Sequence, residues 1–204
     1  MYDQLLVELR NEDRASFHNF MRMPPEMFDE LLARVGPRIT KEHTSCREPL
    51  EPGLKLALTL RHLASGCKNS SMKFGWRVPH NTQSLLVREV CQAIIDEYLD
   101  ELMNCPNTPD GWRAIADQFF QKSNFPHTCG ALDGKHVACR SPPKSGSMYY
   151  NYKGFYSIVL MALVDADYKF IWADVGGRIS SGTSQIYKDC ELKECRVKLY
   201  IRVS

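Results

Sequence analysis

A near-continuous apolar run, Phe155–Val164, constrains the fold of this 204-residue chain more than any other stretch of its sequence. The run is too short to cross a bilayer and is typical of a central strand that is buried on both faces. The next residues, Asp165-Ala166-Asp167, favour a tight turn, and Tyr168–Val175 has the composition of a partner strand. We therefore predict an antiparallel hairpin within a sheet.

The chain changes character ahead of this hairpin. Gly130–Arg140 is predicted to form a strand, and Arg196–Val203 alternates basic and apolar residues as a short strand does. Residues 1–124 lack such runs, and their apolar residues recur at helical spacing. The sequence therefore predicts an α+β chain in two parts, a helical N-terminal region, 1–124, followed by a partial mixed sheet, 125–204.

Helices are predicted from apolar spacing and from residues that favour helix ends. The predicted helices are Tyr2–Arg10, Glu12–Met21, Pro24–Gly36, Leu54–Ala64, a helix that Thr82 caps and that runs to Met103, and one that Thr108 caps and Pro109 begins. The stretch Leu54–Leu102, with Gly66 in a turn, could form a helix-turn-helix, which many DNA-binding proteins use. Helical regions often contain such pairs, however, and no basic recognition face is evident.

Composition narrows the function only a little. Residues 1–124 hold 15 lysines and arginines against 17 acidic residues, and residues 125–204 hold 11 against 7. The mild basic bias of the second part fits a phosphate-facing surface and an ordinary solvated surface equally well. The eight cysteines include no C-x-x-C pair, so a zinc ribbon or thioredoxin-like site is not expected. With no secretory signal, we expect an intracellular protein with free thiols.

Asp133 is the first candidate for chemistry. It lies inside the predicted strand Gly130–Arg140, where a carboxylate is unfavourable unless something binds it. A divalent metal ion is one such partner, and a hairpin turn at Asp133-Gly134 is the plain alternative. Lys135 shares the face of Asp133 in a strand, whereas His136 points to the other face, so His136 is expected to be an ordinary packed or surface residue.

Two further features are weaker candidates. Ser141–Tyr152 holds three tyrosines, a lysine and several hydroxyls, which could contact phosphate and stack on bases. An ordinary aromatic strand edge explains the same residues. Asp174, inside the second hairpin strand, is a candidate for a second carboxylate of a metal site, while Asp165 and Asp167 are most simply turn residues.

Three stretches together resemble the DDE endonuclease domain of PIF/Harbinger transposases and of the nucleases derived from them. They are Gly130–Val137 (GALDGKHV), Pro142–Leu160 (PPKSGSMYYNYKGFYSIVL) and Val164–Phe170 (VDADYKF). The likeness runs from residue 125 to 195. The upstream part, including Arg77-Val78-Pro79, is similar to the helical N-terminal region of the same proteins.

The resemblance implies an RNase H-like fold in which two aspartates and one glutamate hold two divalent ions, Mg²⁺ or Mn²⁺, that cleave DNA. Asp133 matches the first of these carboxylates and is thereby the implied catalytic and metal-binding residue. DNA is the implied partner, together with a Myb-like protein as in Harbinger systems. The nucleus is the implied location, with the cytoplasm as a second one.

The chain also departs from the family's pattern. The family places its second aspartate in a Gly-Asp-x-x-(Phe/Tyr)-Pro motif and its glutamate further on, and nothing here matches either; Thr183 stands where another aspartate is usual. We therefore expect a C-terminally truncated, inactive nuclease homologue whose first strand has an uncovered edge, unless Arg196–Val203 fills it. The alternative is a non-catalytic DNA- or protein-binding module derived from a transposase.

Overall fold

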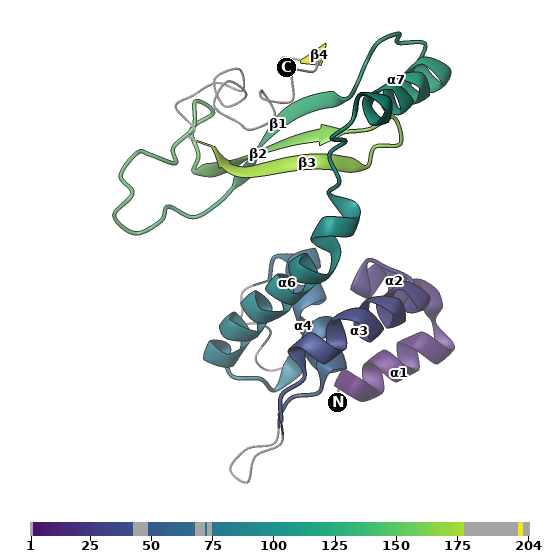
Figure 1. Cartoon of the computed structure of the whole chain (residues 1–204). Helices are drawn as coiled ribbons and strands as arrows, with labels where there is room; N and C mark the ends of the chain where they lie inside the picture. The colour runs from purple at the N-terminus through teal and green to yellow at the C-terminus, as the bar shows by residue number, and fades with distance from the viewer. Residues whose placement is uncertain (1, 43–48, 68–71, 73–74, 178–199, 202–204) are drawn as a thin grey trace. The chain divides into compact units, whose positions relative to one another are not determined.

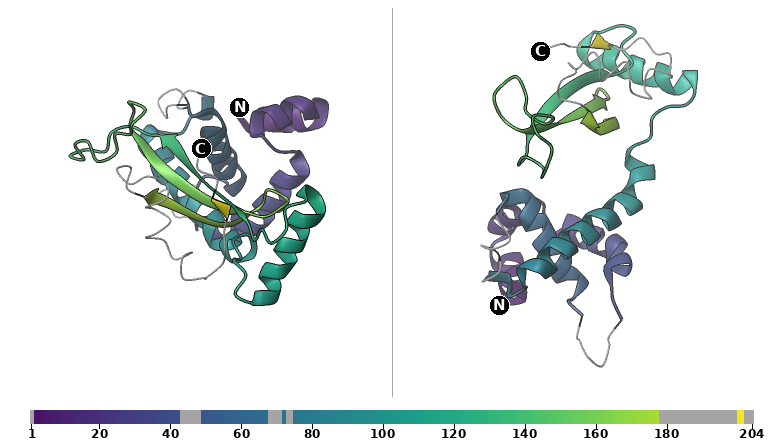
Figure 2. Two further views of the ribbon diagram at one scale, coloured as in Figure 1. Left: turned by 90° about the horizontal axis from the view of Figure 1, so that it is seen from above. Right: turned by 90° about the vertical axis from the view of Figure 1, so that its left-hand side faces the viewer.

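The computed structural model describes residues 2–42, 49–67, 72, 75–177 and 200–201. The chain divides into two compact units, Met1–Leu99 and Asp100–Ser204. The described part of the first unit is helical, and that of the second contains a helix and a four-stranded sheet (Figure 1 and Figure 2). The predicted α+β class is therefore confirmed.

The helices of the first unit share one apolar core. They are α1 (Tyr2–Glu12), α2 (Arg14–Met21), α3 (Pro25–Ile39), α4 (Pro52–Ser65) and α6 (His80–Leu102), which continues past Leu99. The core includes the buried side chains of Phe17, Val35, Leu56, Leu58 and Val90. Asp13 caps α2 by accepting a hydrogen bond from the backbone N–H of Ser16 at 2.9 Å, and Gly66 ends α4 in the left-handed conformation.

Two predicted helix ends are wrong. Helix α3 continues beyond Gly36 and includes Pro37. Proline lacks a backbone N–H, but Pro37 lies in the last turn of the helix, so few intrahelical hydrogen bonds are affected. Helix α6 begins at His80, so Thr82 lies inside the helix rather than capping it. The hydrogen bond from the N–H of Gln83 to the carbonyl of Pro79, at 3.0 Å, already closes the first turn.

The second unit contains α7 (Pro109–Ser123), β1 (Ala131–Ala138), β2 (Ser157–Val164), β3 (Phe170–Gly177) and the short β4 (Tyr200–Ile201). The strand order is β3-β2-β1-β4, with β2 antiparallel to both neighbours and β4 parallel to β1. The predicted hairpin and the Thr108 cap of α7 are confirmed. Two residues of the predicted strand Arg196–Val203 thus pair beside β1, and Thr183 lies outside the described residues.

The two faces of the sheet differ in burial. Along β2, side chains on one face are buried and those on the other are only partly buried, so the predicted burial on both faces is wrong for the described part of the chain. Trp112 and Ile115 of α7 pack against the first face, with Leu163 and Met161. Gly130 allows the side chain of Leu163 to lie against its backbone, since a Cβ atom at position 130 would lie 2.6 Å from Leu163 Cδ1.

Candidate functional site

Asp133 lies in the interior of β1 and is exposed. It pairs with Ala162 of β2, which in turn pairs with Ala173 of β3, so these three residues share the partly covered face. Its neighbour Leu132 points to the opposite face and is 1% exposed. The carboxylate accepts a hydrogen bond from the backbone N–H of Gly134 at 2.8 Å and forms no ion pair within the described residues. It is therefore open to solvent at a position that two neighbouring strands fix.

This placement removes one interpretation of the sequence. The Asp133-Gly134 pair does not form a hairpin turn, because both residues lie inside the ladder between β1 and β2. The carboxylate is neither buried against a partner nor displaced from the sheet. A metal-binding role for Asp133 remains a prediction with which this geometry is compatible.

The other carboxylates of the sheet lie elsewhere. Asp174 pairs with Met161 and therefore occupies the opposite face from Asp133. Asp165 and Asp167 form the turn between β2 and β3, as predicted, and Asp165 Oδ1 accepts the N–H of Asp167 and of Lys169 at 2.8 and 2.9 Å. Lys122 of α7 pairs with Asp167 and holds the pKa of that carboxyl below its usual range.

The described residues alone do not fit a two-ion site. They contain no group of three His, Cys, Asp or Glu side chains that could hold a metal ion. Asp133 is the one described carboxylate of β1–β3 on its face of the sheet, whereas two bridged ions need several oxygen ligands. No reaction step through a metal follows from these residues.

A buried polar network lies at the base of the connection between β1 and β2. Ser157 Oγ lies 3.0 Å from His136 Nδ1 and accepts a hydrogen bond from Asn151 Nδ2 at 2.8 Å. Asn151 Oδ1 accepts the N–H of Lys153 and of Phe155, at 2.9 and 3.2 Å. His136 is thus a partly buried packing residue, as expected. The roles of Asn151 and Ser157 were not predicted, because nothing in the sequence marks a polar residue as buried.

The tyrosines of Ser141–Tyr152 divide between the two roles considered for them. Tyr149 packs against the core of the sheet. Tyr150 and Tyr152 project from the loop and are 50% and 79% exposed. Tyr150 also forms an isolated antiparallel bridge with Tyr156. The interpretation as an ordinary aromatic edge therefore fits Tyr149 and the backbone of Tyr150, and Tyr152 is the most exposed of the three.

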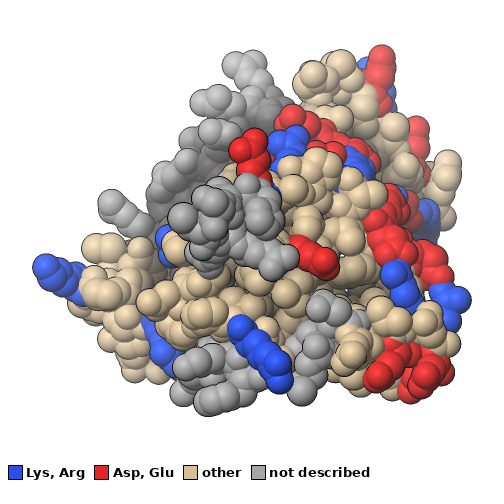
Figure 3. Space-filling model, turned by 90° about the horizontal axis from the view of Figure 1, so that it is seen from below, with Lys and Arg blue, Asp and Glu red and all other residues tan. Residues whose placement is uncertain are grey.

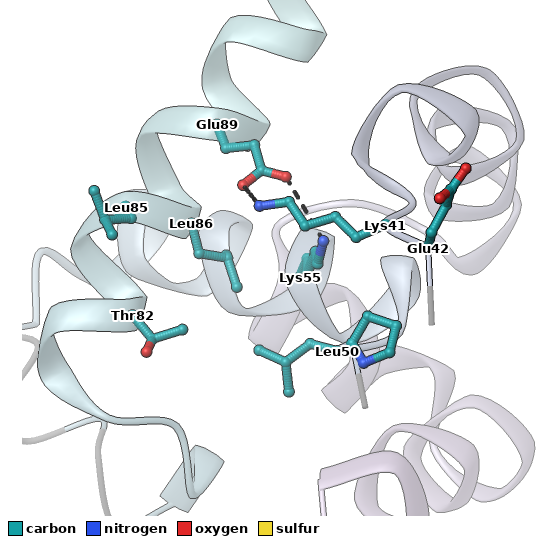
Figure 4. A pocket seen from close by; sticks show the side chains of 9 residues that line it. Lys41, Glu42, Leu50, Lys55, Thr82, Leu85, Leu86 and Glu89 are labelled. Atoms are coloured by element: carbon teal, nitrogen blue, oxygen red, sulfur yellow. Dashed lines mark hydrogen bonds and ion pairs between the residues drawn. The ribbon is translucent and has the colours of Figure 1, made fainter. Parts of the chain in front are cut away.

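In the helical unit, a cavity of about 300 Å³ contains a buried lysine (Figure 4). Lys55 Nζ donates a hydrogen bond to the carbonyl of Ile39 at 2.6 Å and lies 3.6 Å from Glu89 Oε1, while Lys41 pairs with the other oxygen of Glu89. Burial lowers the pKa of Lys55, and the Glu89 charge opposes this effect. Because the ammonium caps the end of α3, it has a structural role that accounts for its burial.

The helical unit offers little support for DNA reading by α6. Gly66 lies in a turn after α4, as the helix-turn-helix hypothesis requires. Helix α6, however, carries five acidic residues and one basic residue, Arg88. Such a helix would repel the phosphates that flank a DNA groove. None of the described helices is long and apolar enough to span a bilayer.

Comparison with known proteins finds an endonuclease family model and two relatives that are named as nucleases. Residues 132–196 match the family model of the DDE superfamily endonucleases. HARBI1 of Xenopus laevis, named as a candidate nuclease, is 20% identical over 169 residues, which cover 83% of this chain and 48% of HARBI1. Its namesake in Rattus norvegicus is 23% identical over 160 residues, or 78% of this chain and 44% of the relative. An ALP1-like protein of Arabidopsis thaliana is 22% identical over 165 residues, or 78% and 40%.

The matched segment, about a third of the chain and including β1, β2 and β3, is thus similar to the DDE superfamily endonucleases. Over most of its length the chain is also similar to the two HARBI1 proteins, at 20% and 23% identity. The chain spans less than half the length of these curated relatives. No solved structure matches it.

Proposed function

We propose that the chain is a homologue of Harbinger-derived nucleases in which Asp133 is a metal-binding carboxylate of a site for hydrolysis of DNA phosphodiester bonds. The observation that carries this proposal is the position of Asp133, exposed inside β1 and within the segment that matches the endonuclease family. The superfamily depends on divalent metal ions in general, and Mg²⁺ or Mn²⁺ is the proposed ion here.

We propose further that these 204 residues do not cleave DNA by themselves. The described residues bring one carboxylate to the relevant face, and one carboxylate cannot position two ions against competing water. The purified chain is incubated with plasmid and oligonucleotide DNA in Mg²⁺ or Mn²⁺, beside the Asp133→Asn variant. The expected result is the same background for both proteins, and cleavage by the wild type that Asp133→Asn abolishes would refute inactivity.

The metal role of Asp133 has a test that does not require activity. Millimolar Mn²⁺ is titrated into the isotope-labelled chain, and paramagnetic broadening of backbone amide signals is recorded. We expect broadening around Gly134 in the wild type and its loss in Asp133→Asn. Asp174→Asn is the matched control, because it removes a carboxylate from the opposite face of the same sheet. Equal broadening in wild type and Asp133→Asn would contradict the metal role.

Binding without chemistry is the second candidate function, and the charge of one segment within the sheet unit favours it. Residues 134–164 hold four basic and no acidic residues. A DNA-binding module of this kind needs no set of metal-binding carboxylates. A nuclear location and a Myb-like protein partner belong to the same proposal, and microscopy of the tagged chain together with co-purification of a Myb-like partner would test them.

A further inference from the structure

The connection between β1 and β2, residues 139–156, concentrates positive charge. Arg140, Lys144 and Lys153 are exposed, and none of them forms an ion pair with a described residue. The connection contains no aspartate or glutamate. Figure 1 shows this loop extending beyond the end of the sheet, and Figure 3 shows basic side chains without acidic neighbours at the corresponding projecting edge. The loop therefore presents an uncompensated positive surface to solvent.

The same loop carries two exposed tyrosine rings. Tyr150 meets Tyr156 edge to face with ring centroids 5.2 Å apart, and Tyr152 meets His136 in the same way at 5.7 Å. Both rings nevertheless remain at least half exposed. Lys153 Nζ lies 5.5 Å from the centre of the Tyr152 ring, so a cation and an aromatic surface are adjacent. Phosphate and base are the two chemical groups that such a pairing suits.

The loop is held in shape before any ligand arrives. Asn151, which is 3% exposed, lies between the two tyrosines and ties its own loop to Ser157 and to the backbone of Lys153 and Phe155. The N–H of Ser157 also donates to the carbonyl of Tyr149 at 2.8 Å. The backbone that carries both tyrosines is thereby anchored on either side of Asn151. A ligand that stacks on these rings would lose little affinity to ordering of the loop.

We infer that this loop is a contact surface for a single-stranded stretch of nucleic acid. Its phosphates contact Arg140, Lys144 and Lys153, and its unpaired bases stack on Tyr150 and Tyr152. A duplex would offer phosphates but no free base faces, so the tyrosines select unpaired strands. A lipid surface fits less well, because residues 139–156 contain no leucine, isoleucine, valine or tryptophan. The inference does not depend on catalysis at Asp133.

The test measures binding of the full chain to fluorescein-labelled oligothymidine of about 20 nucleotides, long enough for several contacts. Fluorescence anisotropy is recorded in EDTA, so the outcome is independent of any metal-binding role of Asp133, over a range of NaCl concentrations. We expect the Kd of the Tyr150→Ala/Tyr152→Ala variant to rise about fivefold or more. Lys144→Gln and Lys153→Gln should each weaken binding and lower the salt dependence by about 0.7 per lost phosphate contact.

Tyr168→Ala is the matched control. Tyr168 is 88% exposed and lies in the β2–β3 turn, at the other end of β2, beside Asp165 and Asp167. Its removal should leave the Kd unchanged, and a duplex of the same length should bind more weakly than the single strand. The inference is overturned if the chain binds no oligothymidine at low salt. It is also overturned if the Tyr150→Ala/Tyr152→Ala and Tyr168→Ala proteins bind equally, or if only anionic vesicles respond to the loop variants.

Discussion

Asn151→Ala tests whether one buried amide holds the β1–β2 loop. The substitution removes the hydrogen bonds from Asn151 Nδ2 to Ser157 Oγ and from the N–H of Lys153 and Phe155 to Asn151 Oδ1. The contact with Ser157 is fully buried, whereas the two N–H groups are partly open to water. A buried group that loses its partner costs about 1–3 kcal/mol, so we expect the free energy of unfolding to fall by about 2 kcal/mol.

The unfolding of the sheet unit can be followed by tryptophan fluorescence. Trp76 belongs to the helical unit, whereas Trp112 and Trp172 lie in the sheet unit. In a Trp76→Phe background, urea unfolding monitored by fluorescence therefore reports the sheet unit. Ser147→Ala is the control, since Ser147 is exposed in the same loop and its hydroxyl bonds no described residue.

A double-mutant cycle decides whether the hydrogen bond itself matters. Asn151→Ala, Ser157→Ala and the double variant are compared, and a coupling free energy of about 1 kcal/mol is expected for a direct buried hydrogen bond. A coupling near zero, or an Asn151→Ala protein as stable as Ser147→Ala, would refute the reasoning. That result would mean that the turns of the β1–β2 loop fix its conformation without the Asn151–Ser157 hydrogen bond.

Two further outcomes follow from close contacts and charge. Gly130→Ala should lower the free energy of unfolding of the sheet unit by about 1–3 kcal/mol, because the new Cβ would overlap buried Leu163. Gly53→Ala is the control and should be neutral or stabilising, because a Cβ there would lie 3.5 Å from Leu32 Cδ2. A Gly130→Ala protein with the urea midpoint of the Gly53→Ala protein would contradict this. Hydrogen bonds from Arg38 and then from Arg34 lower the pKa of Glu97 in the folded protein. The ion pairs of Glu97 therefore stabilise the fold fully above the pKa of an unfolded glutamate, about 4.3. This contribution is lost as the pH falls through the lower pKa of the folded state. Glu97→Gln should therefore lower the Tm at neutral pH and not in strong acid, and a pH-independent difference in Tm would argue against the ion pairs.

Local patterns in the sequence were sufficient for most elements of the fold. The apolar run before Asp165 and the turn that follows it fix the β2–β3 hairpin, and Thr108 caps α7 as expected. Burial on the two faces of β2 could not be predicted, because a continuous apolar run does not reveal which face a neighbouring element covers. The start of α6 was misplaced because a good capping residue, Thr82, follows a helix that has already begun at His80.

The candidate site was predictable in one residue and not in its surroundings. Asp133 was found from the sequence, and the strand register then showed that Asp174 lies on the opposite face. Register depends on pairing between distant segments, which spacing within one segment cannot supply. The network of Asn151 and Ser157 was not predicted because the sequence does not mark a polar residue as buried, and its contact with His136 forms only when β1 pairs with β2.

The pairing of β4 with β1 has a consequence for the order in which the sheet assembles. Ala131 pairs with Val164 on one side and with Tyr200 on the other, so the second contact closes a chain segment about twice as long as the first. Within the described residues, two residue pairs of β4 offset that loss of chain entropy, whereas β1 and β2 pair along their whole length. We therefore expect the pairings of β1 with β2 and of β2 with β3 to form first, and β4 to join the sheet last.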